Sequence, residues 1–424
     1  MNHTMTPATG SGADSPEPPA RAAEPGDGRG SPVLRTIRHY GPVLAFYGVL
    51  KLIGFLVFMY LLDSSGDFRQ KDPRFGGGAH AWDVLASWDG WWYQQIAAYG
   101  YHPALVPVQG AHGLLTLQGN SAAFFPLYPA AMRLVADCTG LGLYAAGMLV
   151  SVVASFVAAL GVYAVAARLR GRRAGLAAAG LWAVWPGSGL EWAGYSESLY
   201  VALAVWACYA VMTRRWLTAG ILTFLAGLNR PTAAALIAGL GVAVLLSLRR
   251  REDGVVRPLA AMLISPLGLA WYLLWVGHRM GDYGGYFALQ KGAWAHTFDY
   301  GAQTLDVFTS VAVGHFDYLF AFPVTDIIGV GVVLLGLILI PLLIHLRPPA
   351  VLTVYTLLTF ALVLGSQQIF GNVSRYLLPA FPLFLPLATA LRRLRLRLLC
   401  AVLGIAAVAS GSYAGYLLFE AGVP

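Results

Sequence analysis

The sequence predicts an all-α polytopic membrane protein with about eleven transmembrane helices, and three observations lead to this prediction. Of the 424 residues, 58% are hydrophobic and 11% are charged, whereas soluble domains are about 25% charged. Apolar runs recur from Pro42 almost to the end of the chain, with a mean hydropathy of +0.63. Arginines cluster in the short turns between these runs. Lipid is therefore the solvent for most of the surface.

The first 32 residues are predicted to form a disordered cytoplasmic tail, and residues 33–424 a single transmembrane domain. The tail is rich in Pro, Gly, Ala and Ser and has almost no large apolar side chains. It therefore cannot bury enough apolar surface to offset the conformational entropy that folding would cost. A cleavable signal peptide would place an apolar run at the very start, whereas the first run begins after Pro42. We therefore expect the first transmembrane segment to be retained.

The apolar runs give the predicted transmembrane segments. A hydrocarbon core of about 30 Å requires about 20 helical residues per crossing. The run 216–228 is short for a crossing, so we expect this helix to be tilted or to reach only part of the way. The predicted segments are 43–62, 142–167, 174–190, 199–213, 216–228, 232–248, 258–277, 322–345, 351–365, 376–390 and 398–419.

The distribution of charge predicts the orientation, because the cytoplasmic turns of membrane proteins are enriched in Lys and Arg. With the N-terminus in the cytoplasm, every inner turn is basic, and the acids beyond the tail lie on outer segments except for Glu252 and Asp253. We predict a multi-pass plasma membrane protein with a cytoplasmic N-terminus and an extracytoplasmic C-terminus and active site. The net charge of +8 follows from these turns, and we expect no nucleic-acid partner. The inner arginines are Arg35, Arg38, Arg168, Arg170, Arg172, Arg173, Arg214, Arg215, Arg249, Arg250, Arg251, Arg257, Arg347, Arg392, Arg393, Arg395 and Arg397.

Two outer segments are too long to be turns. Residues 63–141 and 278–321 are rich in Trp, Tyr, Gly and His, and are polar enough to fold outside the bilayer while resting on its surface. The first is predicted to contain amphipathic interfacial helices. The functional site of the protein is expected on these two segments.

The stretch from Ser87 to Tyr101 carries the main candidate for chemistry. On a helix, Trp88, Trp92, Ile96 and Tyr99 would form one apolar stripe, with Asp89 beside it. A carboxylate near hydrocarbon and aromatic rings is costly to keep ionised, which suits a general base. The alternative is structural, because Asp before Gly and a helix is also a good N-cap.

Two later motifs have both structural and functional interpretations. Phe124-Phe125-Pro126-Leu127-Tyr128-Pro129 would form a rigid bend at the membrane surface ahead of the second transmembrane segment. In Tyr195-Ser196-Glu197-Ser198-Leu199, Glu197 could orient a sugar hydroxyl, while Ser196 or Ser198 would cap the helix from Leu199. Capping is the favoured interpretation for the serines.

Basic side chains on the outer side are scarce. Arg230, in Asn229-Arg230-Pro231, and Arg375, before Tyr376, each lie at the outer end of a predicted helix, where a guanidinium fork could clamp a phosphate. Snorkelling to the interface is the alternative. Lys291 is a further candidate for binding phosphate or sugar.

The first outer segment also contains His80, His102 and His112, whose spacing matches no known metal motif. We predict no dedicated zinc site and, in the absence of a Gly-rich phosphate loop, no cytosolic nucleotide donor.

The succession of motifs resembles the phosphatidylinositol-glycan class V (PIG-V-like) mannosyltransferase family, part of the glycosyltransferase C (GT-C) superfamily. The residues that carry the resemblance run in order from about Leu34 to Pro382. They are Trp88-Asp89-Gly90 with Trp92-Tyr93, Ile96-Ala97 and Gly100-Tyr101, then Phe124 to Pro129, Tyr195 to Ser198, Asn229-Arg230-Pro231, Gln290 with Trp294, and Arg375-Tyr376 with Pro379.

The resemblance implies a GT-C-like helical fold and transfer of a hexose, typically mannose, from a polyprenyl-phosphate carrier to an acceptor on the outer face. Asp89 matches the acidic residue of the large first outer loop and would deprotonate the acceptor hydroxyl, with inversion at the anomeric carbon. Arg375 and Arg230 would stabilise the leaving phosphate. The motif positions also make Trp88, Tyr93, Glu197, Gln290, Lys291 and Tyr376 candidates for substrate binding.

Several alternatives remain open. Asp89 stands without the second acid of some relatives, so a divalent cation stays a possible cofactor. The arginine-rich, lysine-poor composition is typical of a GC-rich bacterium, and the acceptor could be a glycolipid, a lipoglycan, a cell-wall polymer or a secreted protein. A lipid or solute transporter or flippase is the alternative function, although transporters usually place ionisable groups in mid-membrane. A noncatalytic partner subunit of a glycosyltransferase is a third.

Overall fold

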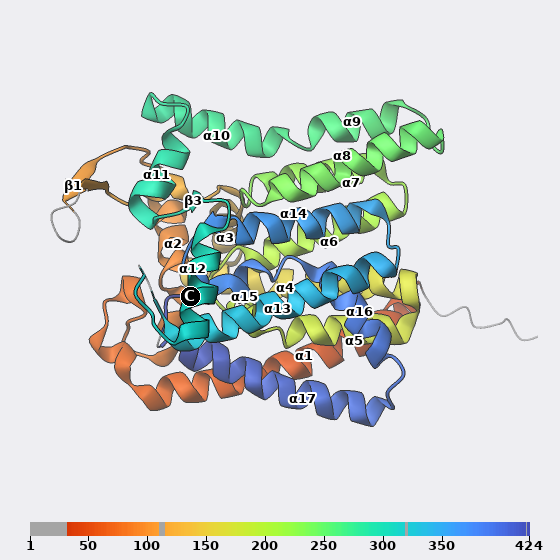
Figure 1. The fold of residues 1–424 in the computed structure, drawn as a ribbon, viewed down its shortest axis with the longest axis horizontal. Coiled ribbons are helices and arrows are strands. Elements are labelled where there is room, and N and C mark those ends of the chain that lie inside the picture. The colour runs from red at the N-terminus through yellow and green to blue at the C-terminus, as the bar shows by residue number, and fades with distance from the viewer. Residues whose placement is uncertain (1–31, 110–114, 319–320, 421) are drawn as a thin grey trace, which may run out of the picture. The chain divides into compact units, whose positions relative to one another are not determined.

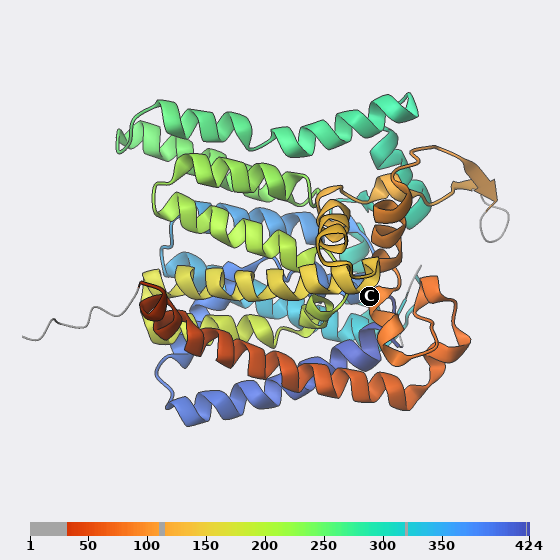
Figure 2. The same cartoon turned by 180° about the vertical axis from the view of Figure 1, so that it is seen from behind.

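The computed structural model describes residues 32–109, 115–318, 321–420 and 422–424, with side chains from Tyr40 onward. Residues 1–31 of the predicted tail lie outside the described residues, and its last residue, Pro32, begins α1. The chain divides into residues 1–41 and 42–424, and the description below concerns the second unit. That unit is almost entirely helical, and its long helices lie side by side in a bundle (Figures 1 and 2).

The described elements beyond short 3-10 turns follow in chain order. They are α1 (Pro32–Ser65), α2 (Asp89–Tyr99), β1 (Pro107–Gln109), β2 (Leu115–Leu117), α3 (Leu127–Thr139), α4 (Leu143–Arg170), α5 (Arg172–Ala183), α6 (Glu197–Met212), α7 (Trp216–Gly227), α8 (Ala233–Arg250), α9 (Val256–Ile264), α10 (Leu267–Met280), α11 (Gly285–Trp294), β3 (Thr297–Phe298), α12 (Ala302–Val313), α13 (Pro323–His345), α14 (Ala350–Leu364), β4 (Ser366–Gln367), α15 (Val373–Tyr376), α16 (Phe384–Leu391) and α17 (Leu396–Ser412), which a π-helical turn (Tyr413–Leu418) extends.

Fewer crossings are supported than the eleven predicted. Within the described residues, six helices are long and apolar enough to span a membrane, or up to eight if each of two bent pairs counts as one span. α5 and α7 have 12 residues each and α14 has 15, less than the roughly 20 that a perpendicular crossing needs. The run 216–228 forms a short helix, and its tilt or partial reach stays a prediction.

Prolines and glycines interrupt three of the predicted segments. The segment 174–190 ends as α-helix at Ala183 and continues as a 3-10 helix, η6 (Pro186–Trp192), because proline cannot donate a helical hydrogen bond. The segment 258–277 is divided at Pro266 into α9 and α10. Around Pro379 and Pro382, α15 and α16 are separated by a bend of 81°.

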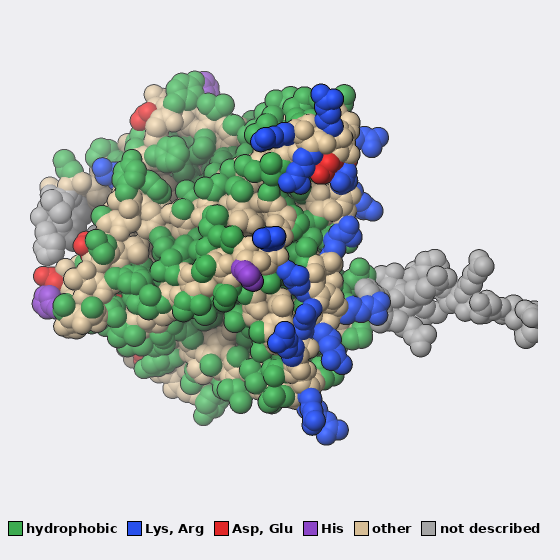
Figure 3. Space-filling view, turned by 45° about the vertical axis from the view of Figure 1, so that its right-hand side comes forward, with side chains coloured by type: hydrophobic (Ala, Val, Ile, Leu, Met, Phe, Trp, Pro, Cys, Tyr) green, Lys and Arg blue, Asp and Glu red, His purple; other side chains and the backbone are tan. Residues whose placement is uncertain are grey.

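The two ends of the bundle differ in charge. The turns α4–α5, α8–α9, α13–α14 and α16–α17 lie at one end, where Figure 3 shows the Lys and Arg side chains gathered. At the opposite end lie α2, α3, α11 and α12 (Figure 1). The C-terminal segment also reaches that end, because Lys71 pairs with Glu420 at 3.1 Å.

The two predicted outer segments form this second end. The first contains α2, α3 and the ribbon of β1 with β2, and the second contains α11 and α12. β3, in the second segment, pairs antiparallel with β4, which follows α14. This pairing brings residues near 296 close to the segment that leads into α15.

Small residues let the central helices pack closely. Alanines such as Ala158, Ala177 and Ala204 are completely buried where α4, α5 and α6 meet. A Cβ atom on Gly175 of α5 would lie 2.7 Å from the Tyr163 ring of α4. Such close approach is the usual means of association for helices in lipid.

Candidate functional site

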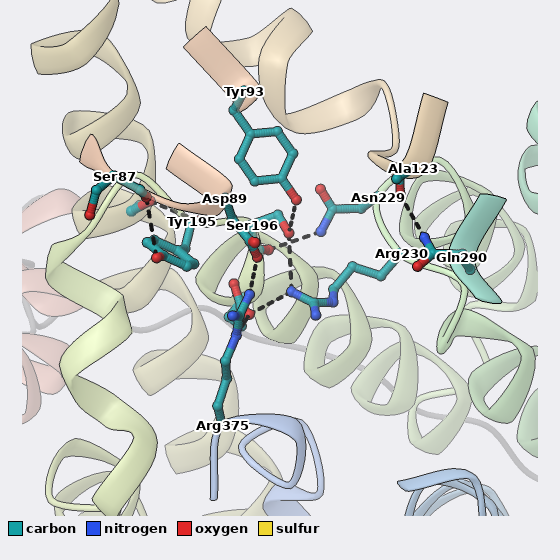
Figure 4. A network of polar contacts seen from close by, with 12 residues as sticks. Ser87, Asp89, Tyr93, Ala123, Tyr195, Ser196, Asn229, Arg230, Gln290 and Arg375 are labelled. Atoms are coloured by element: carbon teal, nitrogen blue, oxygen red, sulfur yellow. Dashed lines mark hydrogen bonds and ion pairs between the residues drawn. The ribbon is translucent and has the colours of Figure 1, made fainter. Parts of the chain in front are cut away.

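Four charged side chains from four separate segments meet at the end of the bundle that carries α2 and α3 (Figure 4). The Nε of Arg375 donates to Glu197 Oε1 at 2.5 Å, and its Nη2 contacts Asp89 Oδ2. Arg230 Nη1 lies 2.6 Å from the same Glu197 oxygen. Glu197 and Arg375 are only 1% and 3% exposed, so this is a buried ionic network.

Helix starts place both carboxylates. Asp89 is the first residue of α2, and Glu197 is the first residue of α6, which follows a 107° bend after η6. The positive end of a helix dipole stabilises a carboxylate at such positions. The two acids are therefore stabilised by their own helices as well as by arginines.

The structural interpretation of Asp89 as an N-cap is wrong. The N-cap position belongs to Trp88, and no side chain caps α2. Trp88 has φ 54° and ψ −117°, a backbone conformation that is strained for a residue with a side chain. The expectation that Asp89 lies in an apolar setting also fails, because its carboxylate faces a guanidinium. The carboxylate remains accessible, with 26% of its side chain exposed.

The predicted apolar stripe is not continuous, because Trp88 precedes the helix. Trp92 stacks on Phe124 at 5.6 Å, Ile96 is buried, and Tyr99 is 73% exposed. Trp92 and Ile96 therefore pack into the protein. The predicted bend is present at Phe124 and Pro126, which stands at the N-cap of α3, and the neighbouring Tyr128 is buried.

A second broken segment positions Arg375. The indole Nε1 of Trp185 donates to Ser374 O at 2.7 Å. A Cβ atom on Gly187 of η6 would lie 2.7 Å from Ser374 O and 2.8 Å from the Arg375 backbone. The guanidinium carbon lies 4.9 Å from the Tyr195 ring centre. Burial and these contacts exclude the snorkelling alternative for Arg375.

Ser196 links the network to α2. Its hydroxyl accepts hydrogen bonds from Tyr93 OH at 2.8 Å and from Arg230 Nη1 at 3.2 Å, and its carbonyl accepts one from Asn229 Nδ2 at 2.9 Å. The prediction that Ser196 or Ser198 caps α6 is wrong, because the Ser196 side chain makes no capping bond and Ser198 Oγ is buried without a partner. Burial, followed by the charge of Asp89, raises the pKa of Tyr93, so its phenol stays a donor.

Several N–H donors of the two arginines have no hydrogen-bond partner among the residues that the structure describes. Arg375 Nη1 and the Nε and Nη2 of Arg230 make no hydrogen bond to a described residue. Burial alone would lower the pKa of Arg230, but Glu197, together with smaller contributions from Tyr93 and Asp89, outweighs burial, so the pKa lies above its usual value. Both guanidiniums are therefore charged and have N–H groups available for an anion.

The other predicted site residues lie at different distances from the network. The ring centre of Tyr376 lies 5.6 Å from the Arg375 guanidinium carbon. Gln290 donates to Ala123 O and to Tyr286 OH, both at 3.1 Å, and so joins α11 to the first outer segment. Lys291 is exposed and has no described contact with the network. The structure therefore does not bring Lys291 to this site.

His296 is a residue at the site that the sequence analysis missed. Burial lowers its pKa to about 4, and the charges of Asp89 and Arg375 both act on it. It is therefore neutral at physiological pH. Of the three histidines considered from sequence, His80 and His102 are exposed, and His112 lies outside the described residues.

Lys51, within the predicted segment 43–62, is a buried and paired cation. It is 5% exposed and pairs with Glu191 at 2.9 Å, and it donates to Ser188 O at 2.6 Å. This buried pair fixes α1 to η6, the segment that contacts the Arg375 backbone.

Across the described ranges, no three His, Cys, Asp or Glu side chains are grouped so that they could hold a metal ion. Asp89 and Glu197 both face guanidinium groups.

Comparisons with known proteins give structural likeness only. No protein-family model matches the sequence, and the curated proteins give no match. Among solved structures, apo ArnT from Cupriavidus metallidurans is 15% identical over 84% of this chain and 60% of ArnT, with a TM-score of 0.49. ArnT bound to undecaprenyl phosphate gives 15% identity, 84% and 61% coverage and a TM-score of 0.48.

The archaeal oligosaccharyltransferase AglB from Archaeoglobus fulgidus, in complex with an inhibitory peptide and a dolichol-phosphate, is 13% identical over 92% of this chain and 57% of AglB, with a TM-score of 0.43. The chain therefore spans about six-tenths of the length of these proteins. At this degree of similarity, the likeness assigns neither a family nor an activity to the chain.

Proposed function

We propose that the protein is an inverting membrane glycosyltransferase. In this proposal a hexose, specifically mannose, moves from a polyprenyl-phosphate carrier to an acceptor hydroxyl on the outer face of the membrane. The observation that carries the proposal is the accessible carboxylate of Asp89 joined to the buried Arg375, which shares Glu197 with the partly buried Arg230, with unused N–H donors on both guanidiniums. An acid beside a double guanidinium site suits a reaction with a base and a departing phosphate.

The arginines supply the place for the donor phosphate. Glu197 accepts from both guanidiniums through one oxygen and so holds them in fixed directions. The remaining N–H groups of Arg375 and Arg230 can then bind phosphate oxygens. As the bond between the anomeric carbon and the phosphate oxygen breaks, the same groups stabilise the charge that develops on the leaving polyprenyl phosphate.

An apolar groove beside Arg230 suits the isoprenoid chain of such a donor. Its volume is about 590 Å³. Leu228, two residues before Arg230, forms part of its wall. The lining residues are Phe224, Leu228, Leu267, Ala270, Trp271 and Leu274, from the segments of α7 and α10.

Asp89 is proposed as the base. The acceptor oxygen forms a bond to the anomeric carbon on the side opposite the phosphate, the hydroxyl proton passes to Asp89, and polyprenyl phosphate departs, so the configuration inverts. Before transfer, Asp89 Oδ2 is engaged by Arg375. A donor phosphate competes for Arg375, which would release the carboxylate for proton transfer only when the donor is in place.

The alternative of a transporter or flippase has one observation in its favour, the buried Lys51–Glu191 pair within the bundle. However, the Lys51 ammonium also donates to Ser188 O and lies 4.1 Å from the centre of the Trp192 ring. These contacts lock α1 to η6, which is the role of a structural ion pair rather than of a transport site.

The experiment is sugar transfer by Asp89→Asn in proteoliposomes with polyprenyl-phosphate mannose as donor. Asn keeps the shape of Asp but cannot accept the proton, so we expect transfer to fall by roughly 10²- to 10⁴-fold while the protein still folds. Asp137→Asn is the matched control, because Asp137 is an exposed acid in the same outer segment. Transfer by Asp89→Asn at the rate of Asp137→Asn would exclude the proposed base.

A further inference from the structure

Arg74 provides a cation near the site that the proposed reaction does not use. It belongs to a 3-10 turn, η2 (Pro73–Phe75). Its guanidinium carbon lies 4.8 Å from the ring centre of Trp92, 4.9 Å from that of Trp91 and 5.0 Å from that of Phe75. Burial lowers the pKa of Arg74, and the charge of Asp72 partly offsets this shift. A charged, partly desolvated guanidinium therefore lies on an aromatic surface.

No carboxylate pairs with this guanidinium within the part of the chain that the structure describes. Two other basic residues of the first outer segment have carboxylate partners, Lys71 with Glu420 and Arg133 with Asp137, each at 3.1 Å, whereas the exposed Arg69 lies over the ring of Phe68. The Asp72 carboxylate instead accepts the backbone N–H of Arg74 at 2.8 Å. Cation–π contacts compensate only part of the lost hydration of a charge.

Two buried N–H donors in the same group of rings also have no partner. They are Arg74 Nε and Trp88 Nε1. The residues are tied together, because the Trp88 backbone N–H donates to Arg74 O at 2.8 Å and the rings of Phe75 and Trp88 lie 5.3 Å apart. Buried donors without acceptors are costly, and an oxyanion would supply the acceptor that these donors lack.

This group of rings lies beside the proposed base. Trp88 directly precedes Asp89, and Trp92 follows it within about one turn of α2. Arg375 reaches the acids from α15 and Arg230 from the turn between α7 and α8, so Arg74 is a separate cationic position. An acceptor whose hydroxyl reaches Asp89 would bring its neighbouring groups to Arg74.

We propose that Arg74 and the indole N–H of Trp88 form an oxyanion subsite for the acceptor. The acceptor then carries a negative charge close to the hydroxyl that receives the sugar. This inference rests on the proposed function. A phosphodiester and a carboxylate both offer the oxygens that a guanidinium binds, and the experiments distinguish these two sources.

The first test measures binding by the purified protein in phosphatidylcholine nanodiscs that are saturated with undecaprenyl phosphate to occupy the donor side. The probes are glycerophosphoglycerol (a phosphodiester), glucuronate (a carboxylate) and neutral glycerol. We expect at least one anion, and not glycerol, to raise the apparent unfolding temperature of the wild type, and expect Arg74→Met to lose this response.

Arg69→Met is the matched control, because Arg69 is exposed and lies over the single ring of Phe68. It should respond as the wild type does. An equal response of Arg74→Met and Arg69→Met, or no response of the wild type to either anion, would overturn the subsite. Arg74→Lys serves as the second variant if Arg74→Met does not fold.

The second test measures transfer. Acceptors extracted from the cell envelope are separated by anion exchange into neutral and acidic fractions and offered with polyprenyl-phosphate mannose. We expect acceptor activity in the acidic fraction, and an acceptor KM at least about tenfold higher in Arg74→Met with an unchanged donor KM.

Activity in the neutral fraction, or equal acceptor KM values in Arg74→Met and Arg69→Met, would refute the subsite and leave the transfer reaction intact. If the wild type transfers to no fraction, the proposed function fails, and the binding measurement still decides whether Arg74 binds anions.

Discussion

Arg375 is the residue that holds the site together. It contacts both Asp89 and Glu197, and its guanidinium also lies near the ring of Tyr195. Two acids and two arginines balance each other, so the network is close to neutral before any ligand binds. This balance allows charged groups to remain buried, because each partner offsets the lost hydration of the others.

Replacing Arg375 with Lys tests the need for a planar fork. A lysine keeps the charge but cannot contact Glu197, Asp89 and a phosphate at the same time. We expect the KM for the polyprenyl-phosphate donor to rise about tenfold or more, measured in proteoliposomes. Arg133→Lys, an exposed arginine paired with Asp137, should leave the donor KM unchanged. The same donor KM in both variants would make Arg375 a structural residue.

His296 should make stability depend on pH. Its pKa is about 4 in the folded protein, against about 6.5 when unfolded. Between these values the unfolded chain binds more protons, so stability is complete above pH 6.5 and falls as the pH drops toward 4. The loss is on the order of 3 kcal/mol.

Thermal unfolding in nanodiscs between pH 7 and 4.5 measures this effect. His296→Gln should lose less stability over the range than the wild type does. His80→Gln, which changes an exposed histidine, should keep the wild-type dependence. If the curves of His296→Gln and the wild type were parallel, His296 would not titrate as described.

At the scale of elements, two broken segments create the site. η6 ends before the bend that precedes Glu197, and α15 carries Arg375 before the bend into α16. If the helices were continuous, Glu197 and Arg375 would occupy ordinary helical positions within the bundle. The breaks instead bring them to helix ends, where they meet. Non-helical backbone in a membrane protein is tolerated where other parts of the protein surround it. Here the hydrogen bond from Trp185 to Ser374 joins the two broken segments to each other.

Gly187→Ala tests the contact between the two segments. A Cβ atom would lie 2.7 to 2.8 Å from the backbone of Ser374 and Arg375 and would displace α15. A shift of about 1 Å at a reacting group can lower the rate by roughly 100-fold, so we expect a loss of transfer on that order. Gly404→Ala is the control, since nothing lies within 4 Å of its added Cβ atom. Equal activities would show that this contact does not position Arg375.

At the scale of the molecule, the sequence predicted the helical membrane character and the gathering of arginines in the turns at one end. Arg230 and Arg375 were recognised as candidates because basic side chains are scarce on the outer side, and Asp89 and Glu197 from the motifs that contain them. Their direct contact was not predictable, because Asp89 and Arg375 lie 286 residues apart. The break after Ala183 was hidden because the apolar run continues through it.

Other features were missed for similar physical reasons. His296 follows Trp294 in a segment without a metal or catalytic motif, and only the pairing of β3 with β4 places it near α15. The Lys51–Glu191 pair joins a residue of the predicted apolar segment 43–62 to an acid just beyond the end of the predicted segment 174–190. Side-chain pairing across a bundle leaves no periodic pattern in the sequence.

The most direct test of the account is the structure of the Asp89→Asn variant with a polyprenyl-phosphate sugar bound. We predict the donor phosphate within hydrogen-bond reach, about 3 Å, of the Arg375 and Arg230 guanidiniums, with the anomeric carbon turned toward residue 89. A donor bound elsewhere, with the network of Arg375, Glu197 and Arg230 intact and without contact to phosphate, would contradict the account.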